Sequence, residues 1–209
     1  EFVGEREPVD YLLNPEEKFA VGPYAVSDYY MESRKAQAHA MENAKQVILD
    51  VAKDFEKISG RKYGLIEEYK MDDAEYAMVI IGSAAGTAKE AVDEMREAGK
   101  KVGIIKIRSF RPFPGEEIAT SLKKCKAVAV MDRCESFSTN GGPVGAETMQ
   151  AMYTNGCTAK AINIMYGIGG RDVTVGDMRG VYDTLEEIAK TGETGPTYRY
   201  MGLRDKEAK

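Results

Sequence analysis

Arginine side chains recur just beyond the apolar segments of this 209-residue chain. Arg108 and Arg111 lie in segment 104–114, which also holds two phenylalanines and two prolines, whereas Arg133 and Arg171 come later. A guanidinium binds carboxylates and phosphates through paired hydrogen bonds. Such a row therefore suits an anionic ligand or an acidic partner surface. The alternative is a rigid turn whose arginines pair with neighbouring carboxylates.

A second candidate is segment 82–87, Gly-Ser-Ala-Ala-Gly-Thr, between an apolar strand pattern and a helical pattern. A small-residue loop before a helix N-terminus can cradle a phosphate, with Ser83 and Thr87 as the contacting side chains. The segment lacks the Lys-Ser/Thr of a P-loop and the full G-x-G-x-x-G fingerprint. A purely structural turn is the alternative. Thr87 and Glu90 are predicted to form a capping box at the start of the helix.

The third candidate is the glycine-dense segment 167–172, Gly-Ile-Gly-Gly-Arg-Asp. Arg171 could hold a carboxylate or phosphate in bidentate fashion. Alternatively, the glycines allow a neighbouring backbone to approach, with Arg171 and Asp172 facing solvent or an interface.

Composition argues against several functional classes. The formal charge of −5, without a basic stripe, argues against nucleic acid as the main partner. No apolar run is long enough to cross a membrane and no signal peptide opens the sequence, so a cytoplasmic protein is expected. Cys125, Cys134 and Cys157 have no zinc or iron–sulfur spacing and are expected to be reduced thiols. His39 is the single histidine, so we expect no self-contained catalytic triad and no metal site.

The hydrophobic pattern predicts an α/β fold: an open, mostly parallel sheet with helices on both faces. Four apolar runs, of which 102–107 is largely β-branched, predict buried strands joined by right-handed helical crossovers: 77–81, 102–107, 127–131 and 159–164. The four arginines then lie at the carboxyl edge of the sheet, where such folds place ligands.

We predict four regions along the chain: an extended arm at 1–31, a long helix and connector at 32–71, the α/β domain at 72–190 and a polar tail at 191–209. The connector contains a short extended piece, indicated by apolar and aromatic residues at 63–69. One face of the long helix is apolar and needs a covering surface, either the sheet or another subunit. That face consists of Ala38, Met41, Ala44, Ile48, Val51, Phe55 and Ile58.

Several segments in this order resemble one known family. The most specific are Arg-Ser-Phe-Arg-Pro-Phe-Pro at 108–114 and Gly-Ile-Gly-Gly-Arg-Asp at 167–172. Gly-Arg-Lys-Tyr-Gly at 60–64, Gly-Ser at 82–83 and Asp-Arg at 132–133 accompany them. Together they resemble the C-terminal, transketolase-C-terminal-like domain of the alpha subunit of 2-oxoacid:ferredoxin oxidoreductases of the pyruvate synthase type.

The resemblance implies an enzyme that converts a 2-oxoacid to its acyl-CoA with thiamine diphosphate and passes electrons through iron–sulfur clusters to ferredoxin. It implies that thiamine diphosphate, Mg²⁺, coenzyme A and the clusters are held largely by other domains or subunits, and that this chain alone binds none of them. The expected partners are the thiamine-binding and iron–sulfur subunits in a hetero-oligomer, with ferredoxin reached through the complex, and no nucleic acid or membrane.

The expected role is a non-catalytic domain that assembles the complex and shapes the active-site and coenzyme A region. Its candidate contacts with coenzyme A, another anion or a subunit are Arg108, Arg111, Arg133, Arg171, Ser83 and Thr87. Two alternatives remain. The chain could be a free-standing anion- or nucleotide-binding module that uses 82–87, or an oligomerisation domain that uses the long helix and the arm.

Overall fold

The computed structural model describes residues 3–7, 15–16, 22 and 24–204. It divides the chain into two compact units, Glu1–Glu42 and Asn43–Lys209. About half of the predicted arm at 1–31 lies outside the described residues. The four-part division at residues 31, 71 and 190 therefore stays a prediction.

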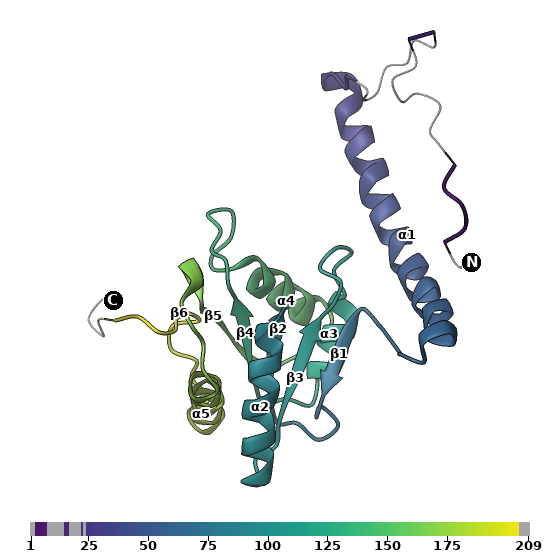
Figure 1. The fold of residues 1–209 in the computed structure, drawn as a ribbon. Coiled ribbons are helices and arrows are strands. Elements are labelled where there is room, and N and C mark those ends of the chain that lie inside the picture. Colours follow the sequence, from purple (N-terminus) through teal and green to yellow (C-terminus); the bar gives the residue numbers. More distant parts are fainter. Residues whose placement is uncertain (1–2, 8–14, 17–21, 23, 205–209) are drawn as a thin grey trace. The chain divides into compact units, whose positions relative to one another are not determined.

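The second unit contains a six-stranded sheet in the order β1-β3-β2-β4-β5-β6 (Figure 1). β1 pairs antiparallel with β3, and the other neighbours are parallel, which confirms the open, mostly parallel sheet. The four predicted buried strands are β2 to β5. The strands are β1 (Ile66–Tyr69), β2 (Tyr76–Ile81), β3 (Val102–Ile107), β4 (Ala127–Asp132), β5 (Lys160–Met165) and β6 (Tyr198–Tyr200).

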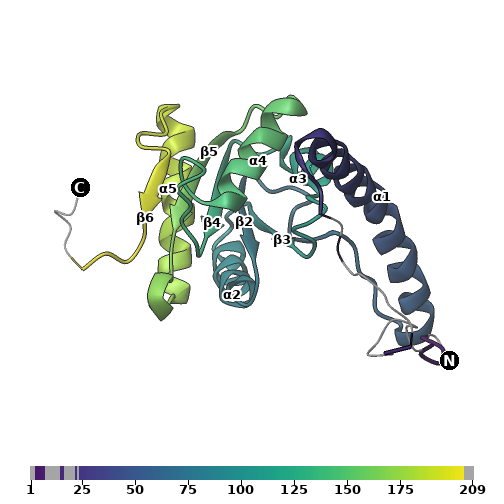
Figure 2. The same ribbon diagram turned by 90° about the horizontal axis from the view of Figure 1, so that it is seen from above.

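Helices cover both faces of this sheet, and Figure 2 shows α2 and α4 on opposite sides. One hydrophobic cluster joins the sheet to α2 (Ala84–Glu97) and α5 (Val175–Thr191). The other joins it to α3 (Gly115–Leu122) and α4 (Pro143–Thr154). Strands covered on both faces read as continuous apolar runs, which explains why β2 to β5 were visible in the sequence.

The helix ends follow the sequence signals with one exception. Thr174 and Asp177 form a reciprocal capping box at α5, and Pro143 is the first residue of α4. The capping box predicted for Thr87 and Glu90 is wrong, because α2 already begins at Ala84. Gly82 adopts a positive φ of 82° that turns the chain, so the helix can start at once.

The long helix is α1 (Ser27–Ser59), which begins earlier than the predicted residue 32 and has no buried residue. It ends where Gly60 adopts a φ of 69°. The predicted polar tail contains β6, a strand that the sequence did not reveal. Within the described residues, no helix is long and apolar enough to cross a membrane.

Candidate functional site at the carboxyl edge of the sheet

The loops after the parallel strands meet at the carboxyl edge of the sheet. The strand order reverses around β2, because β3 lies on one side of it and β4 on the other. Ligands of open α/β sheets bind at such a switch point. Ser83 follows β2 and Arg133 follows β4, so these two residues come from the strands that flank the reversal.

Arg108 is neutralised by a neighbouring carboxylate. Its Nη2 lies 2.6 Å from Oε2 of Glu67 in β1, and its guanidinium lies 4.7 Å from the ring centroid of Tyr63. Glu67 also pairs with Lys89 of α2. The hydrogen bond from Lys89, followed by that from Arg108, holds the pKa of Glu67 below its usual value. This arginine is part of a surface ion-pair network.

Arg111 is held in a similar way. Its Nη2 lies 2.7 Å from Oε1 of Glu147 in α4, and its guanidinium lies 4.3 Å from the ring centroid of Phe110. Phe110 in turn contacts Phe113 edge to face, with ring centroids 6.0 Å apart, across a cis peptide bond before Pro112. For Arg108 and Arg111, the alternative of ion-paired arginines on a turn is therefore confirmed.

Arg133 and Arg171 donate to backbone carbonyls, as Arg108 and Arg111 also do, but only the latter two have carboxylate partners in addition. Nε of Arg133 lies 3.1 Å from the carbonyl oxygen of Gly167. Nη1 of Arg171 donates to the carbonyl oxygen of Gly202, beyond β6. Among the described residues, neither guanidinium has a carboxylate within ion-pair distance. The charges of Arg133 and Arg171 are consequently not compensated by a carboxylate, whereas those of Arg108 and Arg111 are.

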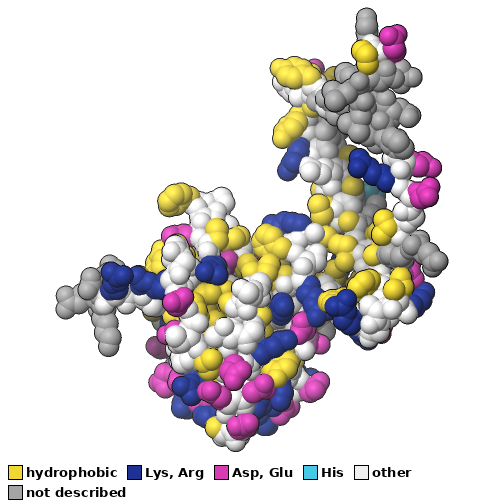
Figure 3. Space-filling view, in the orientation of Figure 1, with side chains coloured by type: hydrophobic (Ala, Val, Ile, Leu, Met, Phe, Trp, Pro, Cys, Tyr) yellow, Lys and Arg dark blue, Asp and Glu magenta, His cyan; other side chains and the backbone are white. Residues whose placement is uncertain are grey.

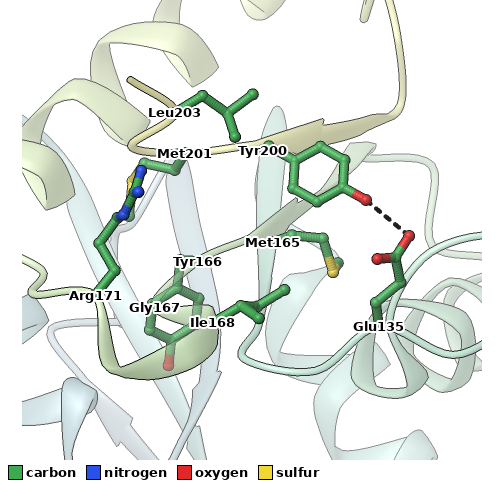
Figure 4. Close-up of a pocket in the computed structure, with 9 residues that line it drawn as sticks. All are labelled: Glu135, Met165, Tyr166, Gly167, Ile168, Arg171, Tyr200, Met201 and Leu203. Carbon is green, nitrogen blue, oxygen red and sulfur yellow. Dashed lines mark hydrogen bonds between the residues drawn. The ribbon is translucent and has the colours of Figure 1, made fainter. Parts of the chain in front are cut away.

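A cavity of about 300 Å³ lies beside Arg171 (Figure 4). Its lining is mostly apolar, and Glu135 and Arg171 lie on different sides of it. The Tyr200 hydroxyl donates to Glu135 Oε1 at 2.7 Å, and the Tyr198 hydroxyl donates to the same oxygen. These two bonds, that of Tyr198 first, lower the pKa of Glu135. The lining residues are Glu135, Met165, Tyr166, Gly167, Ile168, Arg171, Tyr200, Met201 and Leu203.

The sequence analysis missed Glu135 and Tyr200. Glu135 stands at the start of a Ser- and Gly-rich loop, and Tyr200 lies in the segment predicted as a tail. Neither carries a motif. Only the pairing of β6 with β5 brings them together.

A buried polar cluster lies beneath this edge. Asp132 is 1% exposed; its Oδ1 accepts from the Val144 backbone N–H at 3.0 Å, and its Oδ2 from that of Gly145 at 2.8 Å. Asn163 donates to the same Oδ2 and accepts from the backbone N–H of Gly142, each at 2.8 Å. Burial raises the pKa of Asp132, and these hydrogen bonds oppose the rise.

Asp132 therefore occupies the N-terminus of α4 as an internal anion. The glycines make this close approach possible, because a Cβ on Gly142 would lie 2.1 Å from Cγ of Asp132. An external phosphate cannot use this helix N-terminus while the carboxylate fills it.

The N-terminus of α2 is different. Ser83 is exposed at the N-cap position and its side chain makes no capping hydrogen bond. Thr87 is half-buried in the first turn of the helix, beyond its entry. Of the two predicted phosphate contacts, Ser83 is placed at the helix entry and Thr87 is not.

The cysteines do not fit a metal or cluster site. Cys125 is buried, which raises the pKa of its thiol to about 12, whereas Cys134 is exposed and Cys157 is half-buried. Throughout the described part of the chain, no group of three His, Cys, Asp or Glu side chains could hold a metal ion.

Comparison with known proteins decides the family. The family model described as pyruvate:ferredoxin oxidoreductase core domain II matches residues 74–178. The chain belongs to this family. The matched residues run from the turn before β2 into α5, so they include every strand of the sheet except β1 and β6.

Relatives resemble the chain beyond that core. The pyruvate synthase subunit PorA of Thermotoga maritima is 40% identical over 98% of this chain and 51% of its own length. The alpha subunit of the NADH-dependent phenylglyoxylate dehydrogenase of Aromatoleum evansii is 40% identical over 94% of this chain and 49% of its own length. The ketoisovalerate oxidoreductase subunit VorA of Pyrococcus abyssi is 39% identical over 98% of this chain and 52% of its own length. The chain spans about half the length of these curated relatives.

A solved structure also aligns with the chain. It is a 2-oxoglutarate:ferredoxin oxidoreductase from Magnetococcus marinus with 2-oxoglutarate, coenzyme A and succinyl-CoA bound. The TM-score is 0.45 and the identity 18%, over 64% of this chain and 21% of that chain. A likeness at this level supports no conclusion about function.

Proposed function

We propose that this chain is a non-catalytic alpha-subunit domain of a multi-subunit 2-oxoacid:ferredoxin oxidoreductase. Such an enzyme converts a 2-oxoacid, coenzyme A and oxidised ferredoxin to an acyl-CoA, CO₂ and reduced ferredoxin. The domain assembles the complex and shapes its active-site and coenzyme A region. The observation that carries this proposal is the strong similarity, over nearly the whole chain, to proteins named as subunits of such enzymes.

The relatives also indicate what the domain does not determine. Their names refer to three different acids, pyruvate, phenylglyoxylate and ketoisovalerate, yet the identities are 40, 40 and 39%. One relative is NADH-dependent. If this segment selected the acid or the electron acceptor, its sequence would be expected to differ more from relatives that act on one acid than from relatives that act on another. This pattern supports a shared structural role and leaves the substrate acid of this protein open.

The chemistry of the edge supports the same role. Asp132 accepts hydrogen bonds from the N-terminus of α4, and Glu135 accepts hydrogen bonds from two tyrosines. The arginines can bind and orient an anion, but a guanidinium offers hydrogen-bond donors only and does not act as a base. We therefore assign thiamine diphosphate, Mg²⁺ and the iron–sulfur clusters to other parts of the complex.

Arg133 and Arg171 are the proposed contacts to the phosphates of coenzyme A or to an acidic partner surface. An arginine without a carboxylate partner can bind an external anion without first giving up an ion pair. Arg108 and Arg111 already have such partners in Glu67 and Glu147. This contrast reduces the candidate anion-binding arginines from the four predicted to two, Arg133 and Arg171.

The test is co-purification from an extract of the native host, with mass spectrometry of the recovered proteins. We expect a thiamine-binding subunit and a ferredoxin-like cluster subunit. Arg133→Gln with Arg171→Gln should reduce their recovery at 0.15 M salt at least about tenfold, the effect of losing 1.4 kcal/mol of binding energy. Arg111→Gln is the matched control and should leave recovery unchanged.

A chain that is recovered alone and binds a nucleotide tightly would overturn this proposal. The free-standing module would then be correct, and Ser83 at the α2 N-terminus would be the residue to substitute. Equal loss of recovery with Arg111→Gln would contradict the division of the arginines while leaving the subunit role intact.

A further inference from the structure

Three segments at the carboxyl edge of the sheet are connected to one another by side chains. They are residues 133–135 after β4, residues 167–171 after β5 and residues 198–202, which include β6. All three belong to the second compact unit, and each contributes residues to the lining of the cavity of about 300 Å³. We call them the three rim segments.

The first two connections involve the two arginines that lack a carboxylate partner. Arg133 in the first rim segment donates from Nε to the carbonyl oxygen of Gly167 in the second, over 3.1 Å. Arg171 in the second rim segment donates from Nη1 to the carbonyl oxygen of Gly202 in the third. Each of these two rim arginines therefore links its own segment to the next one.

Two tyrosines complete a ring of contacts. The hydroxyls of Tyr198 and Tyr200, in the third rim segment, both donate to Oε1 of Glu135 in the first. The two tyrosine rings also contact each other edge to face, with centroids 5.2 Å apart. Figure 4 shows Glu135 and Tyr200 on one side of the cavity and Arg171 on the other. The three rim segments thus form a closed ring of side-chain contacts at the edge of the cavity.

Neither rim arginine uses its whole guanidinium in this ring. A guanidinium has five N–H donors in a fixed planar arrangement. The bond of Arg133 leaves the pair Nη1 and Nη2, and the bond of Arg171 leaves the pair Nε and Nη2. In the part of the chain that the structure describes, these remaining donors have no other partner. Each rim arginine consequently keeps one two-donor edge, the geometry that binds a phosphate or a carboxylate through paired hydrogen bonds.

The cations around α2 are arranged differently. Figure 3 shows acidic and basic side chains intermixed at the surface around this helix. Lys89 pairs with Glu67 there, and Arg179 pairs with Glu94. The rim arginines, by contrast, contact only backbone carbonyls among the described residues, so their positive charge is not neutralised.

The ring reduces what an anion has to order when it binds. A free arginine side chain is flexible, and the entropy lost on immobilising it weakens binding. Here the carbonyl of Gly202 already fixes Arg171. That carbonyl lies just beyond β6, a strand of three residues at the edge of the sheet. The bonds from Tyr198 and Tyr200 to Glu135 therefore help to fix Arg171 from a distance.

We propose that Glu135, Tyr198 and Tyr200 are positioning residues for an oxyanion that binds the two rim arginines. They hold the third rim segment, and the Gly202 carbonyl of that segment orients Arg171 before the anion arrives. The ligand group is a phosphate or carboxylate whose oxygens match a two-donor edge. This role rests on the proposed function, which assigns anion contacts to the same arginines, and it adds three residues that act without touching the anion.

The first test is titration of the whole chain with inorganic pyrophosphate by isothermal calorimetry, at an ionic strength of about 50 mM to limit screening. We expect a dissociation constant of about 1 mM, which Arg133→Gln with Arg171→Gln should raise at least about tenfold. Tyr198→Phe with Tyr200→Phe should raise it about three- to tenfold at unchanged net charge, because the anion then has to order Arg171 itself. The matched control is Tyr153→Phe, at an exposed position of α4 outside the ring, and it should bind like the wild type.

Succinate, titrated in parallel, identifies the bound group. Tighter binding of pyrophosphate supports a phosphate ligand, and tighter binding of succinate supports the carboxylates of a partner surface.

Glu135→Ala separates the ring from simple electrostatics. The substitution removes a negative charge from the rim, so Coulomb attraction alone would tighten pyrophosphate binding. Loss of the ring should instead weaken it about threefold. Urea denaturation of each variant completes the comparison. A purely structural contact would lower the free energy of unfolding and leave the dissociation constant of the folded chain unchanged.

Deuterium uptake measures the ring itself. The Met201 amide donates to the carbonyl oxygen of Met165 at 2.9 Å, so its exchange reports how well the third rim segment is held. Uptake at Met201 should rise in Arg171→Gln and in the double tyrosine variant alike, and pyrophosphate should lower it in the wild type.

A wild-type chain that shows no saturable binding of pyrophosphate or succinate overturns the proposal. Unchanged affinity in the double tyrosine variant, tighter binding by Glu135→Ala, or unchanged uptake at Met201 in both variants overturns it as well. These measurements use the chain alone, whereas the subunit role is judged by co-purification. Failure of the ring leaves the recovery of subunits unaffected, and a chain recovered without subunits leaves the pyrophosphate affinities unaffected, so the two failures are distinguishable.

Discussion

The carboxyl edge of the sheet contains two kinds of polar group, and removal of each kind should lower the free energy of unfolding by a different amount. Asp132 and Asn163 are buried and satisfy each other and the N-terminus of α4. Arg108 and Arg111 lie at the surface, where each makes an ion pair with one carboxylate. A buried polar group cannot return to water when its partner is removed, whereas a surface charge can. Stability should therefore depend strongly on the buried cluster and only weakly on these surface ion pairs.

The largest effect is expected for Asp132→Ala. The substitution leaves the N–H groups of Val144 and Gly145 and the Asn163 amide without their acceptor, so the free energy of unfolding should fall by about 3 kcal/mol. Urea denaturation monitored by circular dichroism measures the change. Asp132→Asn keeps the shape and one acceptor and should lose about half as much. A loss below about 1 kcal/mol for the alanine variant would contradict the assigned importance of this cluster.

Gly145→Ala should have the next largest effect. A Cβ at this position would lie 2.4 Å from Cγ of Asn163, whose side chain is fixed by its hydrogen bonds. We expect a loss of about 2 kcal/mol in spite of the better helix propensity of alanine. Gly180→Ala in α5 is the matched control, since its Cβ would meet open space, and it should gain up to about 1 kcal/mol. An equal change in the free energy of unfolding for Gly145→Ala and Gly180→Ala would contradict the close approach of Asn163 to Gly145.

Glu67→Gln should show a smaller effect that depends on pH. The pKa of Glu67 is lowered from its ordinary value of 4.5, chiefly by the hydrogen bond from Lys89. A lowered carboxyl pKa contributes stability above the unfolded value of 4.5 and loses it as the pH falls through the folded value. The variant should be less stable by about 0.5 to 1 kcal/mol at pH 7. The difference between variant and wild type, measured by denaturation from pH 7 to pH 3, should vanish at the acidic end.

The smallest effect on stability is expected for Arg111→Gln and Arg171→Gln. Both guanidinium groups are exposed, and removal of either should change the free energy of unfolding by less than about 0.5 kcal/mol. Thermal unfolding monitored by circular dichroism suffices for this comparison. If Arg171→Gln destabilised the chain as strongly as Asp132→Ala, its contact with Gly202 would be structural, and the proposed binding role would lose its basis.

The sequence predicted the parts of the fold that depend on local pattern. β2 to β5 are apolar because both their faces are covered, and Thr174, Pro143 and Gly60 act on neighbouring backbone groups. β6 was missed because three residues, Tyr-Arg-Tyr, are too few to form a recognisable strand pattern; the segment gains its conformation by pairing with β5.

The site was predictable in its residue types but not in its partners. Glu67 lies 41 residues from Arg108, and Glu147 lies 36 residues from Arg111. Such pairings are set by topology, so the sequence could not separate these arginines from Arg133 and Arg171. Asp132 illustrates the same limit, because its inward orientation depends on Asn163, 31 residues away, and on glycines that make room for it.

The absence of buried side chains from α1 has a consequence for how the chain opens. Its backbone hydrogen bonds can break without removing any buried side chain from the core of the sheet. In a dilute chain, the amide hydrogens of α1 should therefore exchange with solvent well before those of β2 to β5. Slowed exchange in α1, detected by deuterium uptake, would report directly on whatever covers the helix.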